Sequence, residues 1–140
     1  MGGLVLRALP LLSNYNADSL KDIITLSSPH RFHPSFHEPS LSQFYRRVNA
    51  FWRDAASLNA AHLSSAIVAS IGGGFRDTLV RNDQTVLTGL IDDAHQLSVS
   101  TYAMPGVGVA ADHQCIVWCK QVMEKVALLI NALASAPLEA

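Results

Sequence analysis

The sequence predicts an all-α fold, an antiparallel four-helix bundle with an additional N-terminal helix. Three long segments repeat apolar residues at steps of three and four, which is the period of one helix face. No segment shows the alternation typical of a half-buried strand, and short connections separate the helical segments. The chain of 140 residues is 49% hydrophobic and 15% charged, which fits a single globular domain.

Residues 1–39 are expected to precede the bundle as an N-terminal helix and a linker. Residues 1–15 fit either a short helix or a strand. Asn16 is a good helix-starting residue, so a short helix is expected from about residue 17 to 27, before Pro29. The segment that follows is rich in proline and histidine and reads as a linker.

The bundle is expected to fill residues 40–135. Its first long helix begins at an N-cap, Ser40, and continues to about residue 70, before a run of three glycines. The second helix is expected over about residues 84–104 and the last over about 112–134. Apolar stripes define these helices: Leu41, Phe44, Val48, Phe51 and Trp52 in the first, Leu87, Leu90, Ala94 and Leu97 in the second, and Ile116, Cys119, Met123 and Val126 in the last.

His95 is the candidate functional residue. On a helix it stands one position off the apolar stripe, on the open side that it shares with Asp92, Val99 and Tyr102. Asp92 precedes it by one helix turn and could orient the imidazole through a hydrogen bond.

Composition excludes several classes of function. A net charge of −1 leaves no basic surface for nucleic acid. No apolar run approaches the roughly 18 residues of a membrane span, and the first residues do not fit a signal peptide. Cys115 and Cys119 are four residues apart, so they are expected to be reduced thiols in a cytoplasmic protein.

A metal site is not expected. The linker histidines His30, His33 and His37, with Glu38, could in principle hold a metal ion, but their spacing matches no zinc motif. The prolines among them prevent a helix that would align the ligands. A di-iron site needs more inward-facing glutamates than a chain with three glutamates can offer.

Hydrolytic chemistry also lacks a motif. Ser-His-Asp catalysis has no nucleophile elbow to support it, and the two cysteines read as core residues. The triple glycine of residues 72–74 lacks the strand–loop–helix pattern of a phosphate-binding loop and reads as a helix stop. Phosphoryl transfer through a phosphohistidine, by contrast, needs only an exposed histidine on a rigid helix.

The segment 40–135 resembles the plant-type histidine-containing phosphotransfer proteins. Their motif His-Gln-Phe-Lys-Gly-Ser-Ser is similar to the run His95-Gln96-Leu97-Ser98-Val99-Ser100-Thr101, although the lysine and glycine of the family are Ser98 and Val99 here. Their long helix has a pattern that Phe44, Val48, Phe51, Asp54 and Leu58 follow, and Cys115, Val117 and Trp118 resemble their last helix.

The resemblance implies a phosphorelay intermediate, which is a carrier and not an enzyme. His95 would accept a phosphoryl group, and Asp92, Gln96, Ser98, Val99 and Tyr102 would line the docking surface. The partners would be the receiver domains of a histidine kinase and of response regulators, which would supply Mg²⁺, so the chain needs no cofactor of its own. A monomer in the cytoplasm and nucleus is expected.

The alternative is a helical adaptor or assembly subunit without chemistry, including a phosphotransfer-like protein impaired in transfer. The aromatic-rich helix and the apolar N-terminus would then form its interface.

Overall fold

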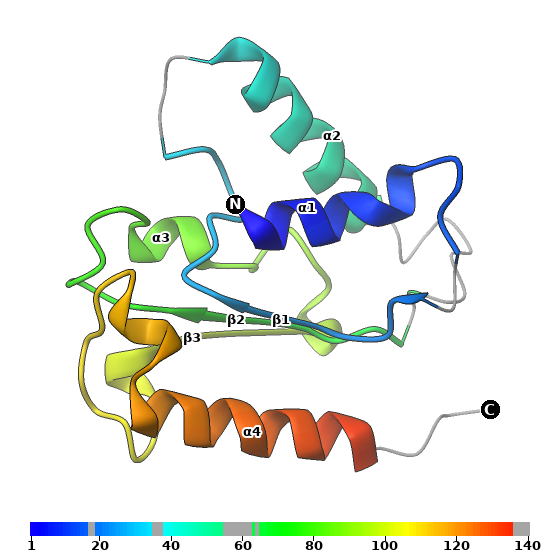
Figure 1. The fold of residues 1–140 in the computed structure, drawn as a ribbon. Coiled ribbons are helices and arrows are strands. Elements are labelled where there is room, and N and C mark those ends of the chain that lie inside the picture. Colours follow the sequence, from blue (N-terminus) through cyan, green and yellow to red (C-terminus); the bar gives the residue numbers. More distant parts are fainter. Residues whose placement is uncertain (17–18, 35–37, 55–62, 64, 136–140) are drawn as a thin grey trace.

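The computed structural model describes residues 1–16, 19–34, 38–54, 63 and 65–135, and it shows an α/β fold (Figure 1). Its described part contains one three-stranded, fully parallel sheet in the order β1-β2-β3. The strands are β1 (Ile23–Leu26), β2 (Val68–Gly72) and β3 (Gln96–Ser100). Ile23 pairs with Val68, and Val68 with Gln96.

Helices cover both faces of this sheet. Helices α1 and α2 lie over one face and α4 lies over the other (Figure 1). The α-helices are α1 (Gly2–Ala8), α2 (Pro39–Asp54), α3 (Asn82–Thr85) and α4 (Lys120–Ser135). Short 3-10 turns are η1 (Leu9–Leu11), η3 (Asp93–His95), η4 (Thr101–Ala103) and η5 (Cys115–Val117).

The central strand β2 is buried along its whole length, because both of its faces carry a hydrophobic core. Successive side chains of a strand point to opposite faces, so Val68 and Ile71 enter different cores. The core on the side of α1 and α2 contains Leu4, Ile23, Tyr45, Val48, Trp52 and Val68, among others. The core on the side of α4 contains Ile71, Met104, Val107, Ile116 and Val122, among others.

The predicted all-α bundle is wrong. The helix expected over residues 17–27 contains β1, and the helix expected over 84–104 is divided among α3, turns and β3. The helix expected over 40–70 is α2 up to Asp54, but its last residues belong to β2; residues 55–62 and 64 lie outside the described part. The last helix is close to prediction, since α4 occupies most of 112–134.

Strand length explains this error. The three strands have four or five residues each, and a short apolar run cannot be distinguished from a buried helix by periodicity. Parallel strands that are covered on both faces also lose the alternation that marks a half-buried strand. The sheet takes β1 from the segment 1–39 and its other strands from the segment 40–135, so both segments contribute to one structure.

A polar network is buried beneath α1 and α2. The Arg7 guanidinium is fully buried and donates to Nδ1 of His30 (3.3 Å) and to Oδ1 of Asn49 (2.8 Å). The other ring nitrogen of His30 lies 2.8 Å from Oγ1 of Thr25, which in turn donates to the Ala69 carbonyl oxygen. An arginine can only donate, so His30 accepts at Nδ1 and carries its proton on Nε2.

His30 is therefore held as a neutral, buried imidazole, although it belongs to the segment that the sequence predicts as a linker. Burial, together with the positive charge of Arg7, lowers the pKa of His30 from 6.5 to about 3. Burial also lowers the pKa of Arg7 to about 10, so the arginine stays charged at neutral pH.

Acid is expected to destabilise the fold through His30. Between pH 6.5 and about 3 the unfolded chain binds a proton at this position and the folded chain does not, so the free energy of unfolding falls as the pH falls. The loss is at most about 1.4 kcal/mol per pH unit. Urea unfolding across this range measures it, and His30→Gln should flatten the dependence.

The matched control is His95→Gln, because the His95 side chain is 36% exposed. This variant should keep the acid dependence of the wild type. An unchanged slope in His30→Gln would show that the acid sensitivity arises elsewhere.

Candidate functional site

The carboxyl ends of β1 and β2 meet at one edge of the sheet, where ligands of open α/β sheets commonly bind. Ser27 follows β1 with a φ of 44°, a strained value for a residue other than glycine, and its amide donates to the Ile71 carbonyl oxygen (2.8 Å). Gly73 follows β2 directly. The carboxyl ends of β1 and β2 therefore lie against each other at this edge of the sheet.

Asp77 lies in the loop that leaves β2, and its side chain is completely buried. One carboxylate oxygen, Oδ1, accepts from the backbone N–H groups of Leu79 (3.1 Å) and Val80 (2.9 Å). The other, Oδ2, lies 3.0 Å from Nδ1 of His113. Three donors thus converge on this carboxylate and fix its orientation.

His113 lies in the loop between β3 and α4, and its side chain is 36% exposed. Because the Asp77 carboxylate accepts at Nδ1, that nitrogen carries the proton and Nε2 has the free lone pair. Within the part of the chain that the structure describes, Nε2 makes no hydrogen bond. Nε2 of His113 can therefore accept a proton from the solvent side, while the buried Asp77 carboxylate holds the imidazole in place.

The loop that carries His113 is held against the end of β2 by backbone contacts. The Gly73 carbonyl oxygen accepts from the Ala111 amide (2.8 Å) and from Oγ1 of Thr101 (2.9 Å). A Cβ atom on Gly73 would clash with the Ala111 carbonyl oxygen and would lie 3.0 Å from Cβ of Asp77. The next residue, Gly74, has a φ of +86° that favours glycine. The glycines predicted to stop a helix instead bring the Asp77 and His113 loops together.

Asp112 fixes the chain directly before His113. Its Oδ1 accepts from the amides of Gln114 (2.9 Å) and Cys115 (2.8 Å), which begins η5. These backbone hydrogen bonds lower the pKa of the Asp112 carboxyl, so it remains ionised at neutral pH.

Exposed apolar side chains lie in the two loops that carry the pair. Phe75 and Leu79 flank Asp77 in its loop and are 78% and 63% exposed. Tyr102 packs against Phe75 with ring centroids 6.0 Å apart, and Val109 is an exposed residue of the loop that carries His113. Such an exposed apolar rim is typical of a surface that meets another apolar molecule.

A buried carboxylate bonded to a partly exposed histidine is the acid–base arrangement of nucleophilic hydrolases. The order along the chain, aspartate before histidine, is also that of the α/β-hydrolases. The fold and the pair together define the class as an α/β protein with a hydrolase-type acid–base pair. The chain belongs to the PGAP1-like alpha/beta domain family, whose model matches residues 1–133.

Curated relatives agree with this assignment. The chain is 36% identical over 129 residues to a GPI inositol-deacylase of Aspergillus terreus, covering 90% of this chain. It is 38% identical over 122 residues to a GPI inositol-deacylase of Coccidioides immitis, and 35% identical over 135 residues to a putative GPI inositol-deacylase C of Yarrowia lipolytica. The chain spans 11% of the first two relatives and 16% of the third.

These findings overturn the phosphorelay interpretation. The chain is not a histidine-containing phosphotransfer protein, since it belongs to the PGAP1-like alpha/beta domain family and its relatives are named GPI inositol-deacylases. The expectation of a carrier that is not an enzyme is contradicted, because the relatives are named as deacylases, which are enzymes. The predicted partners, which are the receiver domains of histidine kinases and response regulators, are also wrong, because they were implied only by that resemblance. The resemblance depended on a helix around His95 that does not exist.

The residues predicted around His95 lie on and beside β3. His95 ends η3, and its Nδ1 is 3.7 Å from Oδ1 of Asp92, which also caps Ala94. Gln96, Ser98 and Val99 belong to β3, where the Ser98 hydroxyl donates to Gln96 and accepts from the Leu87 amide.

Tyr102 reaches the Asp77 region. Its ring contacts Phe75 and lies against Gly74. It is thus the predicted binding residue that the structure brings beside the acid–base pair.

Metal and thiol chemistry find little support in the described residues. No three metal-ligating side chains meet there; His37 lies outside this part, and His30 is buried in the Arg7 network. Both cysteines are free, and partial burial raises the pKa of the Cys115 thiol, which keeps it protonated. In the described part no helix is long and apolar enough to cross a membrane.

Sequence reasoning missed Asp77 and His113. A signal did exist: a buried strand that ends in Gly72-Gly73-Gly74 places the next acidic residue at the carboxyl edge of a parallel sheet. That signal is visible only after residues 68–72 are recognised as a strand.

Gly73→Ala is expected to displace the His113 loop, because its Cβ would collide with the Ala111 carbonyl oxygen. The free energy of unfolding should fall by about 1–3 kcal/mol, the usual cost of overpacking. The low-field proton NMR signal of the His113 Nδ1–H should weaken or vanish. Urea unfolding and NMR measure the two effects.

Gly2→Ala is the matched control, since nothing lies within 4 Å of its added Cβ. It should change the free energy of unfolding by no more than roughly 0.5 kcal/mol. Equal behaviour of the two variants would contradict the packing role of Gly73.

Proposed function

We propose that Asp77 and His113 are the acid–base pair of a hydrolase that removes an acyl chain from the inositol of a glycosylphosphatidylinositol (GPI) lipid. His113 moves the protons, and Asp77 orients it. The observation that carries the proposal is the 3.0 Å contact between the buried Asp77 carboxylate and Nδ1 of His113. The substrate class comes from the relatives, which are named GPI inositol-deacylases.

The pair supplies proton transfer for ester cleavage. Nε2 of His113 takes the proton of an attacking hydroxyl, which then adds to the ester carbonyl carbon. The imidazolium returns this proton to the inositol oxygen as it leaves, and the acyl group stays on the attacking oxygen. Nε2 then takes a proton from a water molecule, whose oxygen adds to the acyl carbon, and returns it to the side-chain oxygen as the fatty acid is released. Asp77 keeps the imidazole in the Nδ1–H tautomer and stabilises its positive charge, because its carboxylate is buried and held by two backbone amides. In α/β-hydrolases the attacking hydroxyl belongs to a serine that precedes the aspartate.

The surroundings of the pair suit a lipid. An acyl chain must lie beside the base while its ester is cleaved, and Phe75, Leu79, Tyr102 and Val109 offer exposed apolar surface there. Contact with the acyl chain would remove this surface from water, which favours binding by about 25 cal/mol per Å².

A chimeric enzyme tests the proposal. The matching segment of the Aspergillus terreus deacylase is replaced by this chain, and fatty-acid release from an inositol-acylated GPI is measured. The chimera should be active, and His113→Ala or Asp77→Asn should each lower the turnover by on the order of 10³- to 10⁴-fold.

The control uses the second Asp–His pair of the chain. Asp92 and His95 also lie close together, but at a 3.7 Å contact with both side chains partly exposed. Asp92→Asn and His95→Ala should leave the turnover within about twofold, since no catalytic contact is lost. A chimera that keeps full activity with His113→Ala would refute the assignment.

A further inference from the structure

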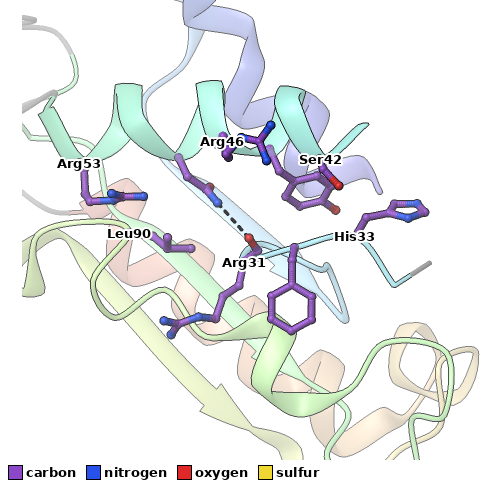
Figure 2. Close-up of a pocket in the computed structure, with 9 residues that line it drawn as sticks. Arg31, His33, Ser42, Arg46, Arg53 and Leu90 are labelled. Atoms are coloured by element: carbon purple, nitrogen blue, oxygen red, sulfur yellow. Dashed lines mark hydrogen bonds between the residues drawn. The ribbon is translucent and has the colours of Figure 1, made fainter. Parts of the chain in front are cut away.

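A pocket of about 410 Å³ lies between α2 and the segment that follows β1 (Figure 2). Figure 2 shows Arg46, Arg53 and Ser42 on α2, with Arg31 and His33 on the segment beneath it. The volume lies within the range of small-molecule sites. The lining residues are Arg31, Phe32, His33, Ser42, Tyr45, Arg46, Asn49, Arg53 and Leu90.

Positive charge is concentrated in this pocket. Three of its nine lining residues are arginines and none is acidic, whereas the whole chain has a net charge of −1. In the described part of the chain, no ion pair engages the guanidinium groups of Arg31, Arg46 or Arg53. Clustered cations without counter-charges repel one another, so an anion bound among them would be stabilised.

Helix α2 has one polar face that lines the pocket and another, apolar face that enters the core. Ser42, Arg46, Asn49 and Arg53 recur at steps of four, three and four, so they share one face. Val48 and Trp52 lie on the face that enters the core. Arg46 and Arg53 are seven residues apart, about 10 Å along the helix axis. This span exceeds a single phosphate and suits a phosphate carried on a ring.

The floor of the pocket is rigid. Nδ2 of Asn49 donates to the Arg31 carbonyl oxygen (3.1 Å), while its Oδ1 accepts from the buried Arg7 (2.8 Å). The Tyr45 hydroxyl donates to the Pro29 carbonyl oxygen (3.0 Å). Burial raises the pKa of Tyr45 to about 12, so the phenol adds no negative charge beneath the arginines.

From this pocket we infer a binding site for the phosphate ester of a polyol, such as an inositol phosphate. The guanidinium groups bind phosphate oxygens in bidentate fashion. Hydroxyl and imidazole groups of Ser42 and His33 suit ring hydroxyls, and the Phe32 side chain offers an apolar wall. A soluble polyol phosphate and a lipid headgroup carry the same phosphate, so both have the chemistry that the site recognises.

The pocket is linked to the acid–base pair through one loop. The Val80 amide donates to Asp77, and the next residue, Arg81, lies over the Phe32 ring at 6.0 Å. The carbonyl oxygen of Phe32 accepts from Gln84 (3.5 Å). If the chain has the proposed deacylase function, the pocket would bind the phosphate of the substrate. Only this link to catalysis rests on the proposed function.

Isothermal titration calorimetry of the 140-residue chain with myo-inositol 1-phosphate tests the site. Binding should weaken with rising salt, and Arg46→Gln or Arg53→Gln should each weaken it about five- to tenfold. Arg47→Gln is the matched control, because Arg47 adjoins Arg46 on the exposed surface but does not line the pocket. It should bind like the wild type. His113→Ala should also bind normally, which separates this inference from the catalytic proposal.

Further titrations identify the ligand chemistry. Weaker binding of inorganic phosphate, with no binding of myo-inositol, supports a phosphorylated polyol. Flotation with phosphatidylcholine vesicles, with and without phosphatidylinositol, separates a lipid source from a soluble one. No binding of inositol phosphate in solution or in vesicles, equal losses in Arg46→Gln and Arg47→Gln, or preferred binding of an acidic peptide would each overturn the inference.

Discussion

The close backbone approach at Gly73 determines how this molecule builds its site. There the carbonyl oxygen of the residue after β2 accepts from both Ala111 and Thr101. These two hydrogen bonds hold the return from β3 against the end of β2. Since Asp77 and His113 are 36 positions apart in the sequence, their contact depends on this approach. A side chain at Gly73 would separate the loops, so the absence of one is a structural requirement.

The two sides of the sheet contribute differently to function. On the side of α4, apolar packing around Ile116 and Val122 anchors the loop that carries His113. On the side of α1 and α2, a buried polar network links Arg7, His30 and Asn49, and Asn49 also forms the floor of the arginine-lined pocket. One sheet thus supports the Asp77–His113 pair at its edge and the arginine-lined pocket above one face.

Burial separates the roles of two histidines, His30 and His113. His30 is completely buried beside a cation, which keeps its imidazole neutral and structural. His113 is partly exposed beside a carboxylate, which orients it and leaves Nε2 available to a substrate. His95 has a carboxylate neighbour as well, but in an exposed turn without a buried support. The role of each histidine therefore depends on two things. One is the group that contacts the first ring nitrogen, and the other is whether solvent can reach the second ring nitrogen.

The sequence by itself determined most of the last helix and most of α2, because those segments keep a long helical period. Only the tertiary structure decided that residues 23–26, 68–72 and 96–100 are strands, since their hydrogen bonds are made with residues distant in the chain. The site was hidden for the same reason. Asp77 and His113 become neighbours only when parallel strands bring their carboxyl ends to one edge, and no local pattern in the sequence records that contact.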